Sequence, residues 1–160
     1  MGKGKKSSQG GFTLIETMVV AAVLGVLASI LLPEMRGYQA RAKVSEALLL
    51  FTNCRNIVHE IYESGANRPA ADSWGCEADN PSRYVAFIRT DDDGVIRLTL
   101  GNAVGDLRLA LHDITLAPLN GSGVVMREDD LGTPVRRWRC GSPADGTDLK
   151  PDFLPSSCRG

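Results

Sequence analysis

Apolar residues form one long run near the start of the chain. Between Phe12 and Leu32 the only charged side chain is that of Glu16. As a helix these residues would span roughly 31 Å, about the thickness of a bilayer core. Residues 12–32 are therefore predicted to form a membrane-spanning helix. A carboxylate costs about 2.5 to 3.5 kcal/mol at the bilayer centre and less near the interface, so Glu16 calls for a charged partner.

The apolar pattern changes after Pro33 from a continuous run to one stripe at helical spacing. The stripe residues recur every three or four positions, with polar residues on the other faces: Val44, Ala47, Leu48, Phe51, Val58, Ile61 and Tyr62. A single helix is expected from Phe12 to about Ser64, ended by the glycine and proline of residues 65–69. Because Pro33 cannot donate a backbone hydrogen bond, it is expected to kink or locally open this helix.

After a predicted loop from Pro69 to Pro81, the pattern becomes that of short strands separated by turns. The strand segments are rich in β-forming residues or alternate between apolar and polar: Arg83–Arg89, Val95–Leu100, Ile114–Pro118 and Val135–Cys140. Three or four strands that follow an amphipathic helix predict an α+β fold with an antiparallel sheet over about residues 83–140.

Size and charge narrow the classes of function. The chain has 160 residues, enough for one domain beyond the long helix. Its formal net charge is −1, and residues 12–160 alone carry −4 because three lysines lie in residues 1–11. A nucleic-acid-binding protein is usually more basic, so such a role would need a local patch. The same lysines favour the cytoplasmic side, which places the later part of the chain outside the cytoplasm.

Four cysteines lie beyond the apolar run, at positions 54, 76, 140 and 158. Disulfides persist outside the cytoplasm, so these cysteines are expected to be bonded. Their spacing leaves all three connectivities open.

The segment Gly10-Gly11-Phe12-Thr13-Leu14-Ile15-Glu16 resembles the type IV pilin family in its prepilin form. The resemblance implies that a membrane prepilin peptidase removes residues 1–11 by cutting between Gly11 and Phe12, and then methylates the new amino terminus at Phe12. A secretory signal would instead be cut after its apolar region, and Ala28-Ser29-Ile30 is only a poor site of that kind.

The resemblance to type IVa pilins extends over the strand series and the C-terminal segment from Phe153 to Arg159. It implies a pilin fold with a C-terminal loop closed by a Cys140–Cys158 disulfide, which leaves Cys54 and Cys76 as a second pair. Residues 12–32 would then be the transmembrane and filament-core helix. Residues 33–160 would form the globular domain, including the amphipathic half of the helix at 33–64.

No enzymatic site is expected. His59 and His112 are the only histidines, and no spacing typical of hydrolases, zinc enzymes or nucleotide-binding loops is present. No catalytic residue, metal or cofactor is therefore predicted. The consecutive acids of residues 91–93 before Gly94 suit a hairpin turn better than a calcium loop. Asn120-Gly121-Ser122 matches a glycosylation acceptor but is expected to be an unmodified turn.

The arginines around Trp138 are the one candidate for nucleic-acid contact, because arginines contact phosphates and aromatic rings stack on bases. In a strand, Arg137 and Arg139 share one face and Arg136 and Trp138 the other. Arg137 and Arg139 are thus the candidate contacts to DNA. A packed tryptophan strand with solvated arginines is the simpler interpretation, and nearby acids such as Asp145 could neutralise them.

The resemblance implies a structural function. The precursor would be held in the inner membrane and then assembled with other pilin subunits into an extracellular filament, with prepilin peptidase and the pilus assembly machinery as partners. Glu16 of an incoming subunit would attract the methylated amine at Phe12 of its neighbour, a pairing strengthened by low local dielectric. Major and minor subunits are not distinguished, nor are adhesion, twitching motility and DNA uptake.

Two alternative functions stay open. A competence-type minor pilin would bind DNA, with Arg137 and Arg139 as contacts. A type II secretion pseudopilin shares the leader and the helix. That family usually lacks the C-terminal disulfide loop, so Cys140 and Cys158 argue against it.

Overall fold

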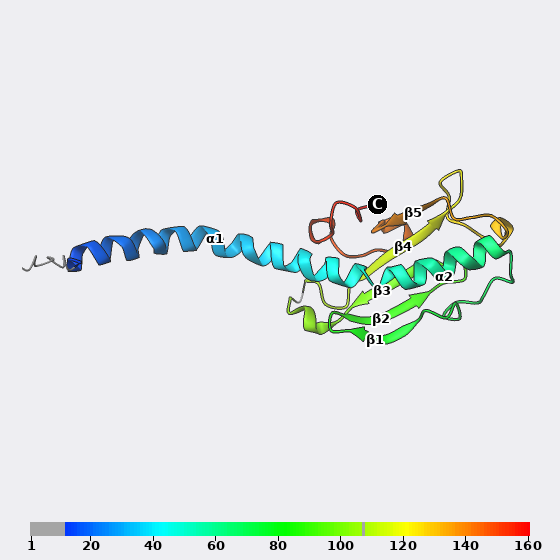
Figure 1. Cartoon of the computed structure of the whole chain (residues 1–160), viewed down its shortest axis with the longest axis horizontal. Helices are drawn as coiled ribbons and strands as arrows, with labels where there is room; N and C mark the ends of the chain where they lie inside the picture. The colour runs from blue at the N-terminus through cyan, green and yellow to red at the C-terminus, as the bar shows by residue number, and fades with distance from the viewer. Residues whose placement is uncertain (1–11, 107) are drawn as a thin grey trace, which may run out of the picture. The chain divides into compact units, whose positions relative to one another are not determined.

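The chain forms an α+β fold in which two helices precede an antiparallel sheet (Figure 1). The computed structural model describes residues 12–106 and 108–160, with the side chains of residues 31–36 outside the description. Contacts within the chain divide it into two units, residues 1–36 and 37–160. The predicted fold class is confirmed.

Two helices, α1 (Leu14–Leu48) and α2 (Phe51–Ser64), stand where one helix was predicted. They are separated by a tightened turn, in which the N–H groups of Leu49 and Leu50 donate to carbonyls three residues earlier. The prediction of a single helix from Phe12 to Ser64 was therefore wrong. Its C-terminal end was right: α2 stops at Ser64 because Gly65 adopts the left-handed conformation, with φ of 67°.

Helix α1 continues through position 33 without interruption, so the predicted local opening of the helix is absent there. The backbone does not need an opening, because neighbouring turns carry the helix past the one hydrogen bond that Pro33 cannot donate. The side chain of Pro33 lies outside the description, and a kink at this residue stays a prediction.

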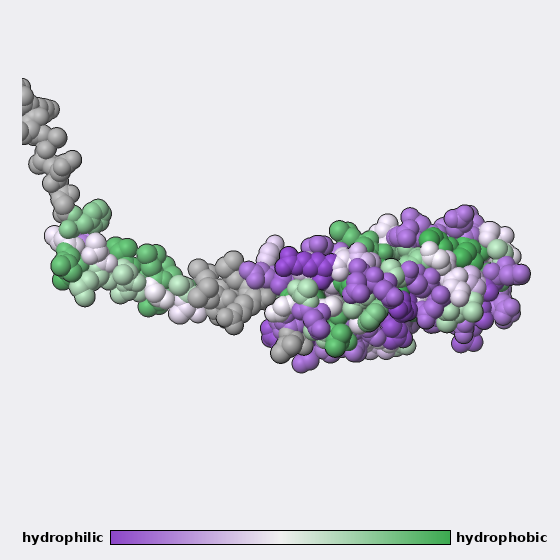
Figure 2. Space-filling model, turned by 90° about the horizontal axis from the view of Figure 1, so that it is seen from below, coloured by the Kyte–Doolittle hydropathy of each residue, from purple (hydrophilic) through white to green (hydrophobic). Residues whose placement is uncertain are grey.

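The described part of the first unit carries apolar side chains on its surface. Phe12, Leu14 and Ile15 are 78%, 80% and 72% exposed. Figure 2 shows a mainly hydrophobic surface along this helical segment. Among the helices that the structure describes, none is long and apolar enough to cross a membrane. The expected membrane span at 12–32 ends on residues whose side chains are not described, and it stays a prediction.

The sheet has five strands, one more than the largest number predicted, and each neighbouring pair is antiparallel. In spatial order the strands are β1 (Ala78–Ser82), β2 (Val85–Thr90), β3 (Ile96–Leu100), β4 (Asp113–Leu119) and β5 (Arg137–Cys140). The sheet therefore spans 78–140 rather than about 83–140.

Strand β1 lies where the sequence predicted a loop. It has no apolar alternation and contains Pro81, which cannot donate to a neighbouring strand. The structure places β1 at the edge of the sheet, paired only with β2, where a proline is tolerated. The strand predicted to start at Arg83 begins instead at Val85, because Arg83 and Tyr84 form the turn between β1 and β2.

The core lies between the sheet and one face of the helices. Both sides of the tightened turn contribute to this face, whose buried residues are Ala40, Val44, Ala47, Phe51, Cys54, Val58 and Tyr62. They pack with the alternating residues Ile96, Leu98 and Leu100 of β3, all fully buried. This confirms the amphipathic stripe and the inward face predicted for the second strand.

Candidate assembly site

Glu16 lies in the first turn of α1, where the backbone N–H groups have no helical acceptor. Its Oε2 is 3.5 Å from the backbone nitrogen of Thr13, the outer limit of a hydrogen bond. The positive end of the helix dipole also favours a carboxylate at this place. The side chain is exposed and surrounded by the exposed apolar residues Leu14, Ile15, Met18 and Val19. It is therefore an unneutralised charge on an apolar surface.

This geometry gives the carboxylate one clear chemical role, which is to attract a cation. If α1 is covered by lipid or by other helices, Glu16 has no water to solvate it and a cationic partner becomes favourable. Phe12, two residues before the start of α1, would supply an amine if the chain were cut in front of it. Gly11 and the rest of the predicted leader, residues 1–11, lie outside the described residues.

Both disulfides implied by the resemblance are present in the second unit. Cys140 bonds Cys158 with their Cα atoms 4.5 Å apart, and Cys54 bonds Cys76 with a Cα distance of 5.1 Å. Each closes a loop for which the chain-entropy estimate is a stabilisation of about 3 kcal/mol. The first bridge fixes the C-terminal segment to β5, and the second fixes the loop before β1 to α2.

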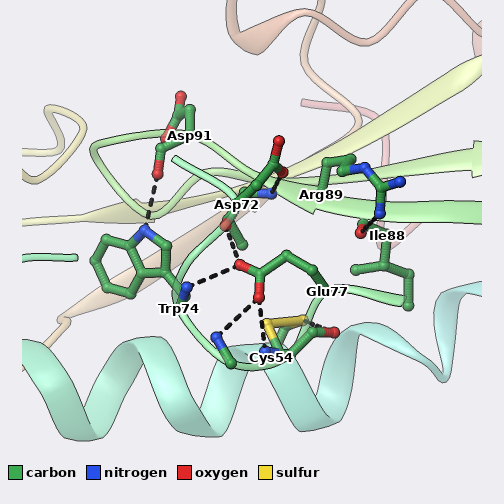
Figure 3. Close-up of a disulfide and its surroundings, with 10 residues drawn as sticks. Cys54, Asp72, Trp74, Glu77, Ile88, Arg89 and Asp91 are labelled. Atoms are coloured by element: carbon green, nitrogen blue, oxygen red, sulfur yellow. Dashed lines mark hydrogen bonds between the residues drawn. A yellow bond between two sulfur atoms is a disulfide. The ribbon is translucent and has the colours of Figure 1, made fainter. Parts of the chain in front are cut away.

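Glu77 organises the loop that carries Cys76, and the sequence analysis missed it. The Glu77 carboxylate accepts backbone hydrogen bonds from Trp74, Gly75 and Cys76 at 2.8 to 3.0 Å, and Thr90 Oγ1 donates to it as well. Figure 3 shows this carboxylate between the loop backbone and the Cys54–Cys76 bridge. Burial acts to raise the pKa of Glu77, but these hydrogen bonds outweigh burial and hold the pKa below its ordinary value. No local pattern marks such a residue, since Thr90 lies on another strand.

We expect Glu77→Gln to lower the free energy of unfolding by about 1 to 3 kcal/mol, because hydrogen bonds to a charged acceptor are replaced by weaker ones. A group with a depressed folded-state pKa stabilises the fold above its unfolded-state pKa and loses that contribution as the pH falls through the folded-state pKa. The parent should therefore lose more stability than the variant as the pH falls below about 4.3. Denaturant unfolding from pH 7 to 3 tests this, and parallel pH profiles would contradict it.

The two arginines predicted to point outward have different surroundings. Arg139 forms two hydrogen bonds to Asp145, of 2.7 and 2.6 Å, and that aspartate is only 4% exposed. The prediction of an outward arginine pair is therefore wrong for Arg139, whose charge is neutralised inside the fold. Arg137 is exposed and forms no salt bridge with any described residue. The expectation that Asp145 would neutralise an arginine of this group is confirmed.

The acidic turn and the predicted glycosylation triplet both serve the backbone. Asp91 accepts hydrogen bonds from the N–H groups of Asp93 and Val95, which closes the turn between β2 and β3. Asn120 accepts from the N–H groups of Ser122 and Val124 in the same way. Within the described ranges, no group of three or more His, Cys, Asp or Glu residues could hold a metal ion.

Known proteins resemble the chain over most of its length. Residues 40–159 match the family described as pilin (bacterial filament), and residues 6–32 match the prokaryotic N-terminal methylation motif. Type IV major pilin protein PilE1 of Neisseria gonorrhoeae is 32% identical, and the match covers 94% of this chain and 87% of that protein. Fimbrial protein EcpC of Eikenella corrodens is 34% identical, with 96% and 93% covered. A fimbrial protein of Pseudomonas aeruginosa is 27% identical, with 94% and 97% covered.

Proposed function

This chain belongs to the type IV pilin family and is a structural subunit of a pilus, and from that premise we propose how its first residues take part in assembly. The leader is cut between Gly11 and Phe12, and Phe12 becomes the methylated amino terminus. The precursor waits in the inner membrane through residues 12–32 before it joins an extracellular filament. Prepilin peptidase and the pilus assembly machinery are the partners in these steps.

The main support is the surface of α1 in the first unit. Large apolar side chains are exposed on all of its sides, from Phe12 to Ile30, so this surface is unsuited to water. Lipid tails and neighbouring helices are both apolar, so exchanging one for the other costs little hydrophobic free energy. Apolar contacts alone then select no particular register between subunits.

Glu16 supplies the register. It is the only charged residue between Phe12 and Leu32, so a helix that slides past another along its apolar surface meets one favourable position. That position brings the carboxylate of one subunit to the amino terminus of its neighbour. The attraction is stronger in a medium of low dielectric than in water and offsets the cost of removing both charges from water.

The cleavage is tested by the intact mass of the subunit in purified filaments. We expect a chain that begins at Phe12, carries one additional methyl group and contains both disulfides. Reduction before the measurement should add the mass of four hydrogens without releasing a fragment. A filament subunit that retains the lysines of residues 1–11, or that begins after Ser29, would contradict the proposed processing.

A further inference from the structure

A groove lies between α2 and β5 in the second unit. It encloses about 580 Å³. Arg55 of α2 forms one side, Arg136 and Arg137 form the other, and Leu116 and Trp138 are among the residues at its apolar base. The sequence brought attention only to the arginines around Trp138. The fold adds Arg55 to them and removes Arg139, which Asp145 neutralises.

The three arginines of the groove are not neutralised. In the part of the chain that the structure describes, no acid lies within salt-bridge distance of Arg55, Arg136 or Arg137. Other arginines of the same unit are paired with acids, namely Arg68, Arg89, Arg97, Arg108 and Arg139. The groove thus concentrates free positive charge in a chain whose formal net charge is −1.

The groove also contains an aromatic ring with an available donor. Trp138 is half-buried, and Arg55 Cζ lies 5.6 Å from its ring centroid. The indole N–H has no acceptor among the described residues, and it is not among their buried polar atoms that lack a partner. An arginine stacked on an indole keeps the N–H groups of its edge free for a phosphate.

We propose that this groove binds single-stranded nucleic acid. Arg55, Arg136 and Arg137 contact successive phosphates, and a base lies against Trp138 over the apolar base of the groove. An acidic peptide would satisfy the arginines, but it has no planar group for the indole. A duplex keeps its bases paired and would engage the arginines alone.

Tryptophan fluorescence of the full-length mature chain in detergent micelles tests this, with a 12-nucleotide oligothymidylate as the probe. Trp74 is 3% exposed and its indole N–H donates to the Asp91 carbonyl, so quenching reports on Trp138. Three phosphate contacts predict a slope of about −2 for the logarithm of the binding constant against that of the salt concentration, and Arg137→Ala should reduce it to about −1.4. Trp138→Leu should weaken binding by about 5- to 150-fold, and Trp138→Phe should retain most of it.

Arg83→Ala is the matched control. Arg83 also lies 5.6 Å from an aromatic ring, that of Tyr84, but in the turn between β1 and β2 at the opposite edge of the sheet. It should bind the oligonucleotide as the parent does. The proposal is wrong if Arg83→Ala weakens binding as much as Arg137→Ala, if the oligonucleotide causes no quenching at low salt, or if oligoglutamate or a 12-base-pair duplex binds as tightly. Filament yield of Arg137→Ala should stay normal, which separates this site from the assembly role of Glu16.

Discussion

Glu16→Val should leave the processed subunit abundant in the membrane and make filaments scarce. The change makes the helix more apolar, so insertion is not impaired, and the bond after Gly11 is untouched. Assembly then has to bury the amino terminus of a neighbouring subunit without its partner, which costs roughly 3 to 5 kcal/mol for an unpaired buried charge. That cost corresponds to a loss of more than about a hundredfold in the association constant at each contact. Sheared filament yield, divided by the membrane pool of processed subunit, measures the effect.

Two control variants separate charge from other effects in the same helical turn. Thr17→Val removes a polar side chain whose hydroxyl only donates to the Leu14 carbonyl, so filament yield should stay near that of the parent. Glu16→Gln keeps size and polarity but loses the charge, and it should behave like Glu16→Val. If Glu16 only reaches toward water at the membrane surface, the valine variant should assemble as well as the parent. Normal piliation by Glu16→Val, in cells that lack the parent subunit, would therefore overturn the proposed role of Glu16.

Gly141→Ala should destabilise the second unit by roughly 2 to 5 kcal/mol. Gly141 has a φ of +76°, which is unfavourable for alanine. A methyl group there would overlap the carbonyl oxygen of Cys158 and lie 2.9 Å from its carbonyl carbon. Neither side can yield easily, because Cys158 is bonded to Cys140, the residue next to Gly141. Denaturant unfolding of the full-length chain under non-reducing conditions gives the difference.

Gly132→Ala separates the conformational cost from the steric one. Gly132 has a similar φ of +83°, but a methyl group there would have nothing within 4 Å. It should cost about 1 to 2 kcal/mol, the penalty of the left-handed conformation alone. The difference between the two variants is the cost of the collision with Cys158. Equal destabilisation by both would show that the C-terminal segment moves freely and that the bridge does not hold it against β5.

The sequence predicted those features that depend on residues close together along the chain. Helical spacing identified the stripe that packs on the sheet, including Val44, Val58 and Tyr62, and Gly65 marked the end of α2. Alternation identified the inward face of β3. Local periodicity suffices in these cases because helices and strands repeat their side-chain directions over a few residues.

Other features required the tertiary structure, because they join residues that are distant in sequence. Strand β1 has no apolar pattern of its own and exists because β2 offers it backbone partners at the sheet edge. Glu77 became an organising residue only when Thr90 and the loop before β1 came together around it. Arg139 and Arg137 look equivalent along the strand, yet the chain folds Asp145 onto one of them and leaves the other free beside Arg55. Which charges a fold neutralises depends on distance in space, and a sequence shows only the residue types available for pairing.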